Sequence, residues 1–318
     1  MINRIKNKLY REGIIKPKSQ KGSKCILMYH GIDKYENMDY NARFFSEKNF
    51  KNQLIYFKKN YNIVSLDDYF KNKNLSSNKL NIAITFDDGY KNNFKYALPI
   101  LEKLKVPAIF YITGLNNTND KIIWADLIDI ATPFIKGEIT FQGKIFNKNN
   151  KGIYADLRDY IRSIEIGGST SFQELKQTIY SVCDIKLNKP EFLDYWELMN
   201  DEEIKASSKS KYVKIGSHGY YHNNLANINF EHALDEVVKS KNYLENLVQY
   251  EINSIGYPDG GYTEQLKVKA LELGFNQQCA VSYKFESDKN DDFISNRIGL
   301  YPGTNVHILN MEIQNFCK

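Results

Sequence analysis

The chain has no apolar run of about 18 residues, the least that a membrane-spanning helix needs. Its N-terminus also lacks the apolar core of about 7–15 residues that a secretory signal peptide carries. These two absences predict a protein that is made and kept in the cytoplasm. A mean hydropathy of −0.51 and a hydrophobic share of 42% are typical of a water-soluble chain that can bury a full core.

Cysteine is scarce in this sequence. Four residues, Cys25, Cys183, Cys279 and Cys317, are widely separated, and no Cys-x-x-Cys pair occurs. This spacing predicts neither a zinc ribbon nor a disulfide framework. Free thiols in a reducing compartment are therefore expected.

Excess charge is confined to one segment. The formal net charge is +5, but residues 1–24 hold eight Lys or Arg and one Glu, whereas the rest holds 35 basic and 37 acidic residues. We therefore expect a basic N-terminal arm over residues 1–24, and no basic nucleic-acid-binding face on the domain itself. Ile2, Ile5 and Leu9 add a short apolar stripe to the arm. The arm either makes a peripheral contact with anionic lipid at the inner face of the membrane or stays solvated.

Two adjacent carboxylates, Asp87 and Asp88, follow the apolar part of the run Ile-Ala-Ile-Thr-Phe-Asp-Asp-Gly at residues 82–89. Residues 82–86 predict a buried parallel strand, and Gly89 lets the chain turn at its end. Neighbouring residues at a strand terminus point in different directions, so Asp87 and Asp88 are expected to take different roles. One carboxylate can hold a metal ion while the other accepts a proton.

The second candidate motif consists of His218 and His222, which follow a short apolar strand near residues 212–216. An i, i+4 spacing places two imidazoles on one face of a helical turn, about 5–6 Å apart between Cβ atoms. With Asp88 as third ligand, the set leaves an open coordination position for water, as in catalytic zinc sites. A structural calcium ion would need about six or more oxygen ligands.

Neither motif is specific alone. Further Asp-Asp pairs at residues 67–68 and 291–292 are typical of solvated turns or helix starts, and an isolated His-x-x-x-His is a weak metal signal. Only the pair at residues 87–88 follows an apolar strand and precedes a Gly. Because both motifs end predicted strands, where α/β folds place their chemistry, together they predict one hydrolytic metal site.

Residues 85–89 and 218–222 resemble the first two signature motifs of the polysaccharide deacetylases, carbohydrate esterase family 4. Residues 26–31, 96–101 and 255–260 are similar to the family's opening strand, the segment after its first motif and its Pro-Gly loop. The resemblance covers about residues 24–116 and 200–300. It implies an α/β fold, a distorted (β/α)7-type barrel of parallel strands. It also implies one divalent metal ion, zinc above all with cobalt or nickel as alternatives, and removal of acetyl groups from N-acetylated sugars.

Carried over by position, the resemblance makes Asp87 the general base. It implies three metal ligands, namely Asp88, His218 and His222. It also implies a substrate or oxyanion loop made of Tyr257, Pro258, Asp259 and Gly260. Two positions depart from the family: Gly219 stands where a Ser or Thr hydroxyl is usual, and Gly256 where an Arg often orients the catalytic carboxylate.

Three residues are candidates for orienting Asp87 or for the acid side of the reaction. Arg297 matches an Arg-Ile pair of many relatives and either replaces the missing Arg or forms a surface salt bridge. His30 lies in the segment that resembles the opening strand. His307 precedes a predicted terminal helix, and an ordinary helix-surface residue is the alternative there.

A β/α rhythm runs along residues 25–318, which we expect to form one catalytic domain. Ser46 can cap a helix with apolar residues at 50, 54 and 57, a helix over 92–104 should kink at Pro99, and residues 233–248 carry one apolar stripe. Residues 117–200 break the rhythm with a helix near 124–128, a hairpin at 138–146 and helices at 172–182 and 191–199. We expect an insertion that either walls the substrate groove or pads the outside of the barrel.

The sequence thus predicts a metal-dependent hydrolase that removes N-acetyl groups from a sugar in a glycan, or in a lipid-linked or nucleotide-linked precursor. Rival activities of the same site are deformylation and O-deacetylation. Outside the enzymes, the alternative is a catalytically silent sugar-binding relative.

Overall fold

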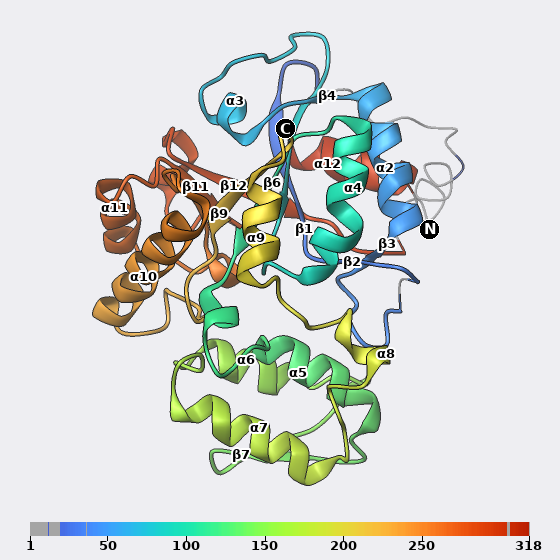
Figure 1. The fold of residues 1–318 in the computed structure, drawn as a ribbon, viewed down its shortest axis with the longest axis vertical. Helices are drawn as coiled ribbons and strands as arrows, with labels where there is room; N and C mark the ends of the chain where they lie inside the picture. Colours follow the sequence, from blue (N-terminus) through green and yellow to red (C-terminus); the bar gives the residue numbers. More distant parts are fainter. Residues whose placement is uncertain (1–11, 13–19, 36, 304–305, 318) are drawn as a thin grey trace.

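The computed structural model describes residues 12, 20–35, 37–303 and 306–317, and a barrel of parallel strands forms its centre (Figure 1). Hydrogen bonds join the strands in the order β1, β12, β11, β10, β9, β6, β5, and β5 pairs back to β1. This closed seven-stranded barrel confirms the predicted distorted (β/α)7 fold. Its strands are β1 (Lys24–Tyr29), β5 (Asn81–Phe86), β6 (Ala108–Ile112), β9 (Val213–Ser217), β10 (Ser254–Gly256), β11 (Gln277–Ala280) and β12 (Ile294–Gly299).

Strand β1 closes the barrel because it is paired on both edges. Its Leu27 lies opposite Ile84 of β5 and Ile298 of β12, with parallel register on both sides. All six residues of β5 are buried, as expected of a parallel strand covered on both faces. Short strands lie beside the barrel, with β4 (Asn62–Ile63) on β5, and β2 (Ile32–Asp33) paired with β3 (Phe45–Ser46).

Helices surround the barrel, and Ser46 caps the first of them as predicted, because its side chain accepts the Asn49 N–H at 3.3 Å. The predicted kinked helix over 92–104 is instead a π-helical turn, Asn93–Ala97, followed by a helix with Pro99 in its first turn. Proline lacks an N–H, so it is tolerated where a new helix begins. The helices are α2 (Glu47–Asn60), α3 (Leu66–Phe70), α4 (Leu98–Leu104), α9 (Asp201–Ser208), α10 (Phe230–Val248), α11 (Glu264–Glu272) and α12 (Val306–Phe316).

Residues 117–200 form a lobe at one end of the barrel, at the bottom of Figure 1. The predicted hairpin is present, and the predicted helix 172–182 is α7. The helix predicted over 191–199 is wrong after Leu193, where α8 (Pro190–Leu193) ends. The sequence did not predict α6 (Ala155–Arg162), because only Leu157 and Ile161 of this helix are buried. One hydrophobic cluster lies mainly in the lobe, and Phe44, Tyr90 and Leu115 join it from outside. Its elements are α5 (Trp124–Ala131), β7 (Ile139–Phe141), β8 (Lys144–Phe146), α6 (Ala155–Arg162), α7 (Thr170–Val182) and α8 (Pro190–Leu193).

Two of the four cysteines are paired, contrary to the expectation of free thiols. Cys25 in β1 and Cys317 after α12 form a disulfide with Cα atoms 5.8 Å apart, whereas Cys183 and Cys279 are free and buried. The paired residues are 292 positions apart in the sequence, so only the closed fold brings them together. This pair removes the thiol argument for a reducing compartment.

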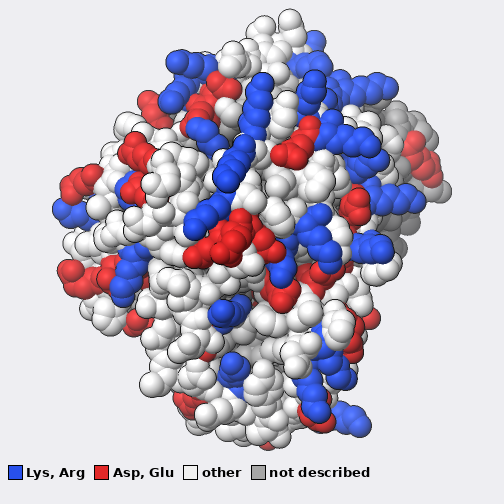
Figure 2. Space-filling view, viewed as in Figure 1, with Lys and Arg blue, Asp and Glu red and all other residues white. Residues whose placement is uncertain are grey.

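No helix in the described part of the chain is long and apolar enough to cross a membrane. Lys and Arg are mixed with Asp and Glu on the face that Figure 2 shows. Most of the basic arm, residues 1–11 and 13–19, lies outside the described residues, so its contact with lipid stays a prediction.

Candidate metal centre

The two adjacent carboxylates leave the end of β5 in different directions. Asp88 has a left-handed backbone (φ +76°), as has Gly89 (φ +78°), so the chain turns sharply directly after Asp87. Both carboxylates are buried, with 3% of Asp87 and 1% of Asp88 exposed. Asp87 faces Arg297 on β12, whereas Asp88 faces the imidazoles that follow β9.

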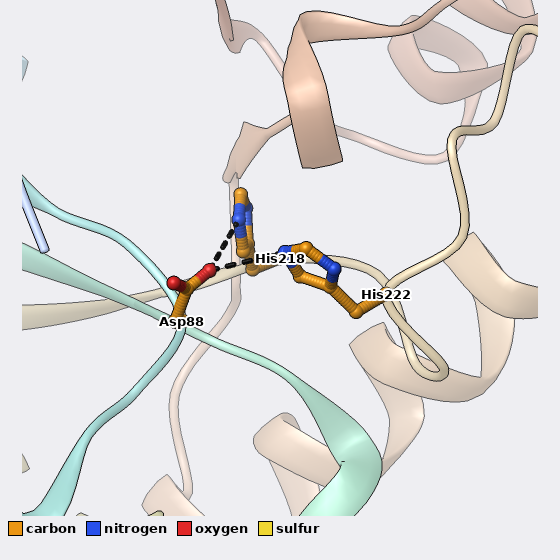
Figure 3. A group of neighbouring side chains, drawn as sticks. All are labelled: Asp88, His218 and His222. Carbon is orange, nitrogen blue, oxygen red and sulfur yellow. Dashed lines mark hydrogen bonds and ion pairs between the residues drawn. The ribbon is translucent and has the colours of Figure 1, made fainter. Parts of the chain in front are cut away.

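Asp88, His218 and His222 converge on one point (Figure 3). Asp88 Oδ1 lies 3.2 Å from His218 Nε2 and 3.1 Å from His222 Nε2, and the three ligand atoms lie within 4.8 Å of one another. Burial raises the pKa of Asp88, but hydrogen bonds with the two imidazoles outweigh burial and hold its pKa well below the usual range. The carboxylate is therefore charged at neutral pH and ready to bind a cation.

The tautomer of His218 suits a metal ligand. Its Nδ1–H donates to the Gly256 carbonyl at 2.6 Å, so a neutral His218 that gives up the Nε2 proton it shares with Asp88 would offer the Nε2 lone pair to an ion. Two imidazole nitrogens and one carboxylate oxygen, all buried, fit the donor set of a catalytic zinc site. These three residues would hold the divalent ion that the family implies.

The segment from His218 to His222 is a loop, and the expected helical turn is absent. Gly219 (φ +70°) and His222 (φ +58°) both have left-handed backbones. The N–H groups of Tyr220 and Tyr221 donate to the Glu236 carboxylate of α10, at 3.1 and 2.8 Å, where a helix would use backbone carbonyls. Burial raises the pKa of Glu236 to about 7, although these hydrogen bonds act to lower it.

Arg297 makes a paired contact with Asp87. Its Nη1 lies 2.6 Å from Asp87 Oδ1 and its Nη2 2.8 Å from Oδ2, and only 1% of Arg297 is exposed. Arg297 is therefore not a surface ion pair. Burial raises the pKa of Asp87, but the charge of Arg297 and then of His218 prevail, so its pKa lies below the usual value.

The site opens into a cavity of about 420 Å³, and the lobe forms one of its walls. Trp124, Arg158 and Arg162 line it together with Asp87 and Asp88. The insertion therefore forms a wall of this cavity, and that the cavity is the substrate groove stays a prediction. A cavity of about 600 Å³ beside α2 contains none of the predicted site residues.

The loop after β10 forms another part of the cavity wall. Tyr257 and Asp259 line the cavity, while Pro258 and Gly260 are buried. Asp259 has a left-handed backbone (φ +52°), and its carboxylate accepts Arg162 Nε at 3.2 Å. The Gly260 N–H donates to the Tyr257 carbonyl. Within the described residues the Asp259 N–H has no backbone acceptor, whereas the N–H groups of Tyr257 and Gly260 do; the oxyanion role of this loop stays a prediction.

The structure separates the two remaining histidine candidates. His30 lines the cavity, and burial lowers its pKa to about 4, so the imidazole is neutral at pH 7. His307 is an exposed residue of α12 and does not line the cavity.

Sequence reasoning missed several residues that contact the site. Arg43 Nη1 lies 3.5 Å from Asp88 Oδ2 and Nη2 contacts Asp126 of α5, whose pKa burial raises to about 7. Asp126 and Glu236 did carry a signal, because each is an acid on an otherwise apolar helix face. Arg43 carried none, since it lies in a loop between β2 and β3.

Comparisons with solved structures agree with the fold. A polysaccharide deacetylase from Bacillus cereus is 17% identical with a TM-score of 0.57, covering 92% of this chain and 68% of that chain. The deacetylase PplD of Streptococcus pyogenes, in complex with acetate, is 18% identical with a TM-score of 0.54, covering 91% and 97%. IcaB from Ammonifex degensii is 15% identical with a TM-score of 0.56, covering 92% and 98%. At these identities the likeness shows a shared fold.

Sequence comparison identifies the family. No curated protein gives a significant match. A family model described as polysaccharide deacetylase matches residues 75–140 and 174–277, more than half of the chain, and these ranges hold Asp87, Asp88, His218 and His222. The chain belongs to the polysaccharide deacetylase family.

Proposed function

We propose that this protein is a metal-dependent N-deacetylase of an N-acetylated sugar, carried in a glycan or in a lipid-linked or nucleotide-linked precursor. One observation carries the proposal, namely that two adjacent carboxylates in one cavity have different partners. Asp88 lies against two imidazoles and Asp87 against a guanidinium. A metal ligand and a proton acceptor are thereby held side by side, which is the combination that amide hydrolysis by water requires.

Each residue then has a role in the reaction. A divalent ion, zinc above all and cobalt or nickel as alternatives, supplies Lewis acidity when held by Asp88, His218 and His222. Asp87, kept ionised by Arg297, takes a proton from the attacking water. We assign to the Asp259 N–H, in the loop that lines the cavity, the role of donating to the oxygen of the tetrahedral carbon.

The leaving amine needs one proton, and Asp87 holds one after the attack. His30 is a poor donor at neutral pH because burial keeps it unprotonated. Arg297 stabilises the ionised form of Asp87, so protonated Asp87 gives up its proton readily. We therefore assign the return of the proton to the amine nitrogen to Asp87, which leaves acetate and a free amino sugar as products.

Acetate release from a panel of N-acetyl sugars tests the activity, with free glycans, nucleotide-linked sugars and lipid-linked sugars as the three arms. Matched N-formyl and O-acetyl compounds test the rival reactions. Release from an N-acetyl compound alone supports the proposal. Preference for formyl or O-acetyl groups would replace it, and sugar binding without turnover of any compound would indicate a silent relative.

The division of roles is tested by Asp87→Asn and Asp88→Asn. Asp87→Asn should keep the metal and lose about 10²-fold or more in turnover, because the proton acceptor is gone. Asp88→Asn should bind metal more weakly and regain part of its activity with excess zinc or cobalt. Asp235→Asn, on the exposed side of α10, is the matched control and should change neither property. Retention of near-normal turnover by Asp87→Asn with metal bound would refute Asp87 as the base.

A further inference from the structure

A buried carboxylate holds the loop that carries both histidine ligands. Glu236 is 2% exposed, and its Oε2 accepts the N–H groups of Tyr220 and Tyr221, the two residues just before His222. A Cβ on Gly219 would lie 3.2 Å from this same oxygen. Gly219 has no hydroxyl of the kind that the family resemblance leads one to expect at this position. The Glu236 carboxylate of α10 lies close to where that side chain would begin.

Asn223 connects Glu236 to the lobe. Its Nδ2 donates to Glu236 Oε1 at 2.7 Å and to the Gly167 carbonyl at 3.0 Å. Its Oδ1 accepts the N–H groups of Ile166 and Gly167, each at 2.8 Å. Asn223 is fully buried, so all these bonds are shielded from water. A chain of hydrogen bonds thus runs from the lobe backbone through Asn223 and Glu236 to the ligand loop.

The lobe also packs directly on the ligand loop. A Cβ added at Gly167 would lie 2.0 Å from the Tyr221 carbonyl oxygen, so only glycine allows this contact. Gly167 lies between the ranges 75–140 and 174–277 that match the family model. The contact is therefore a feature of this chain that the family match does not supply.

The loop needs such support because its backbone is strained. Left-handed residues such as His222 persist only where surrounding contacts fix them. His222 is itself a ligand, so a change in its backbone moves its imidazole away from Asp88. Contacts behind metal ligands commonly set their orientation and the affinity for the ion.

We propose that Glu236 and Asn223 are positioning residues that couple the lobe to the metal ligands, so that the lobe and the barrel form one catalytic unit. The proposal rests on the proposed metal-dependent function. It predicts that changes in the lobe, at residues that touch neither metal nor substrate, alter metal affinity.

The main variant is Glu236→Gln, with Asp235→Asn as the control one residue earlier on α10. Zinc affinity is measured by chelator competition, and ligand geometry by the visible spectrum of the cobalt-loaded protein. We expect Glu236→Gln to bind zinc about 10–100-fold more weakly and to change the cobalt spectrum. The control should match the wild type in both. If Glu236→Gln matches the wild type in both zinc affinity and cobalt spectrum, the proposal is overturned. This holds even if the variant melts at a lower temperature.

Gly167→Ala provides a second test that removes no hydrogen-bonding side chain. It adds one methyl group in the lobe, against Tyr221, and should also weaken zinc binding. The control is Gly152→Ala, also in the lobe, where a Cβ meets nothing within 4 Å but the backbone is left-handed (φ +74°). This change strains the lobe without touching the ligand loop, so its zinc affinity should match the wild type. Equal zinc affinity in Gly167→Ala and the wild type would overturn the coupling to the lobe. Weakened zinc binding in a protein that deacetylates no sugar would refute the proposed function and leave the coupling intact.

Discussion

Replacing Arg297 by Gln tests how Asp87 is kept ready to accept a proton. The two side chains form two parallel N–H···O bonds of 2.6 and 2.8 Å, and the Arg297 side chain is 0% exposed. Removing one partner of a buried ion pair typically costs about 3–5 kcal/mol of folding free energy. Asp87 would remain buried with no cation against it, so its pKa would rise above the usual value.

The pH dependence of both activity and stability should follow from that change. The lowered pKa of Asp87 contributes stability above the unfolded value of 3.8, and this contribution is lost as pH falls through the folded value. The stability gap between wild type and Arg297→Gln should therefore be small below about pH 4 and widen as pH rises, up to the raised pKa of Asp87 in the variant. The acid limb of kcat/KM should move to higher pH, with a loss of about 10²-fold or more at pH 7 that is partly regained at pH 9.

Acetate release as a function of pH and urea unfolding at several pH values measure these two effects. Arg297→Lys is the matched control, because it keeps the charge and loses the two parallel bonds. Its acid limb should lie between those of the wild type and of Arg297→Gln. An acid limb of Arg297→Gln that coincides with the wild type would show that Arg297 does not hold Asp87 ionised.

Three further predictions concern the metal, the arm and the disulfide. The purified protein should carry about one divalent ion by mass spectrometry, and His222→Ala should lose most of it, whereas unchanged content would refute the ligand assignment. Deleting residues 1–22 should preserve turnover of a water-soluble substrate and weaken binding to anionic vesicles at low salt; equal binding would show that the arm is no membrane contact. Oxidised protein, denatured without reductant, should have two reactive thiols, and Cys25→Ser should lower the unfolding free energy by about 2–5 kcal/mol; four reactive thiols would contradict the Cys25–Cys317 pair.

Local patterns in the sequence were sufficient to predict many strands and helices of the barrel. A buried parallel strand is an apolar run, and residues 82–86 form one, so β5 and the turn after it follow from composition and from Gly89. The stripe on α10 was equally readable, with Ala233, Val237 and Leu244 buried. Such signals arise from burial of a whole face, which needs no knowledge of the partner.

Other features depend on contacts that a single segment cannot encode. The four-residue spacing of His218 and His222 is compatible with a helical turn and with a loop. Glu236, which belongs to α10, favours the loop because it accepts the N–H groups of Tyr220 and Tyr221. Arg297 approaches Asp87 only because β12 pairs with β1 next to β5. The Arg43 contacts join a loop, a strand end and a helix of the lobe, so no spacing in the sequence predicts them.

Strand order explains why two adjacent carboxylates can serve different purposes. Around the barrel, β12 and β1 lie on one side of β5, and β6 and β9 on the other. Asp87 turns toward β12 and Asp88 toward the loop after β9, so each finds its partners in a different direction. The lobe lies in the sequence between β6 and β9 and touches the histidine loop. Changes at the lobe contact should therefore weaken metal binding and leave the acid limb set by Arg297 and Asp87 in place, and a shift of that limb in Gly167→Ala would refute this separation.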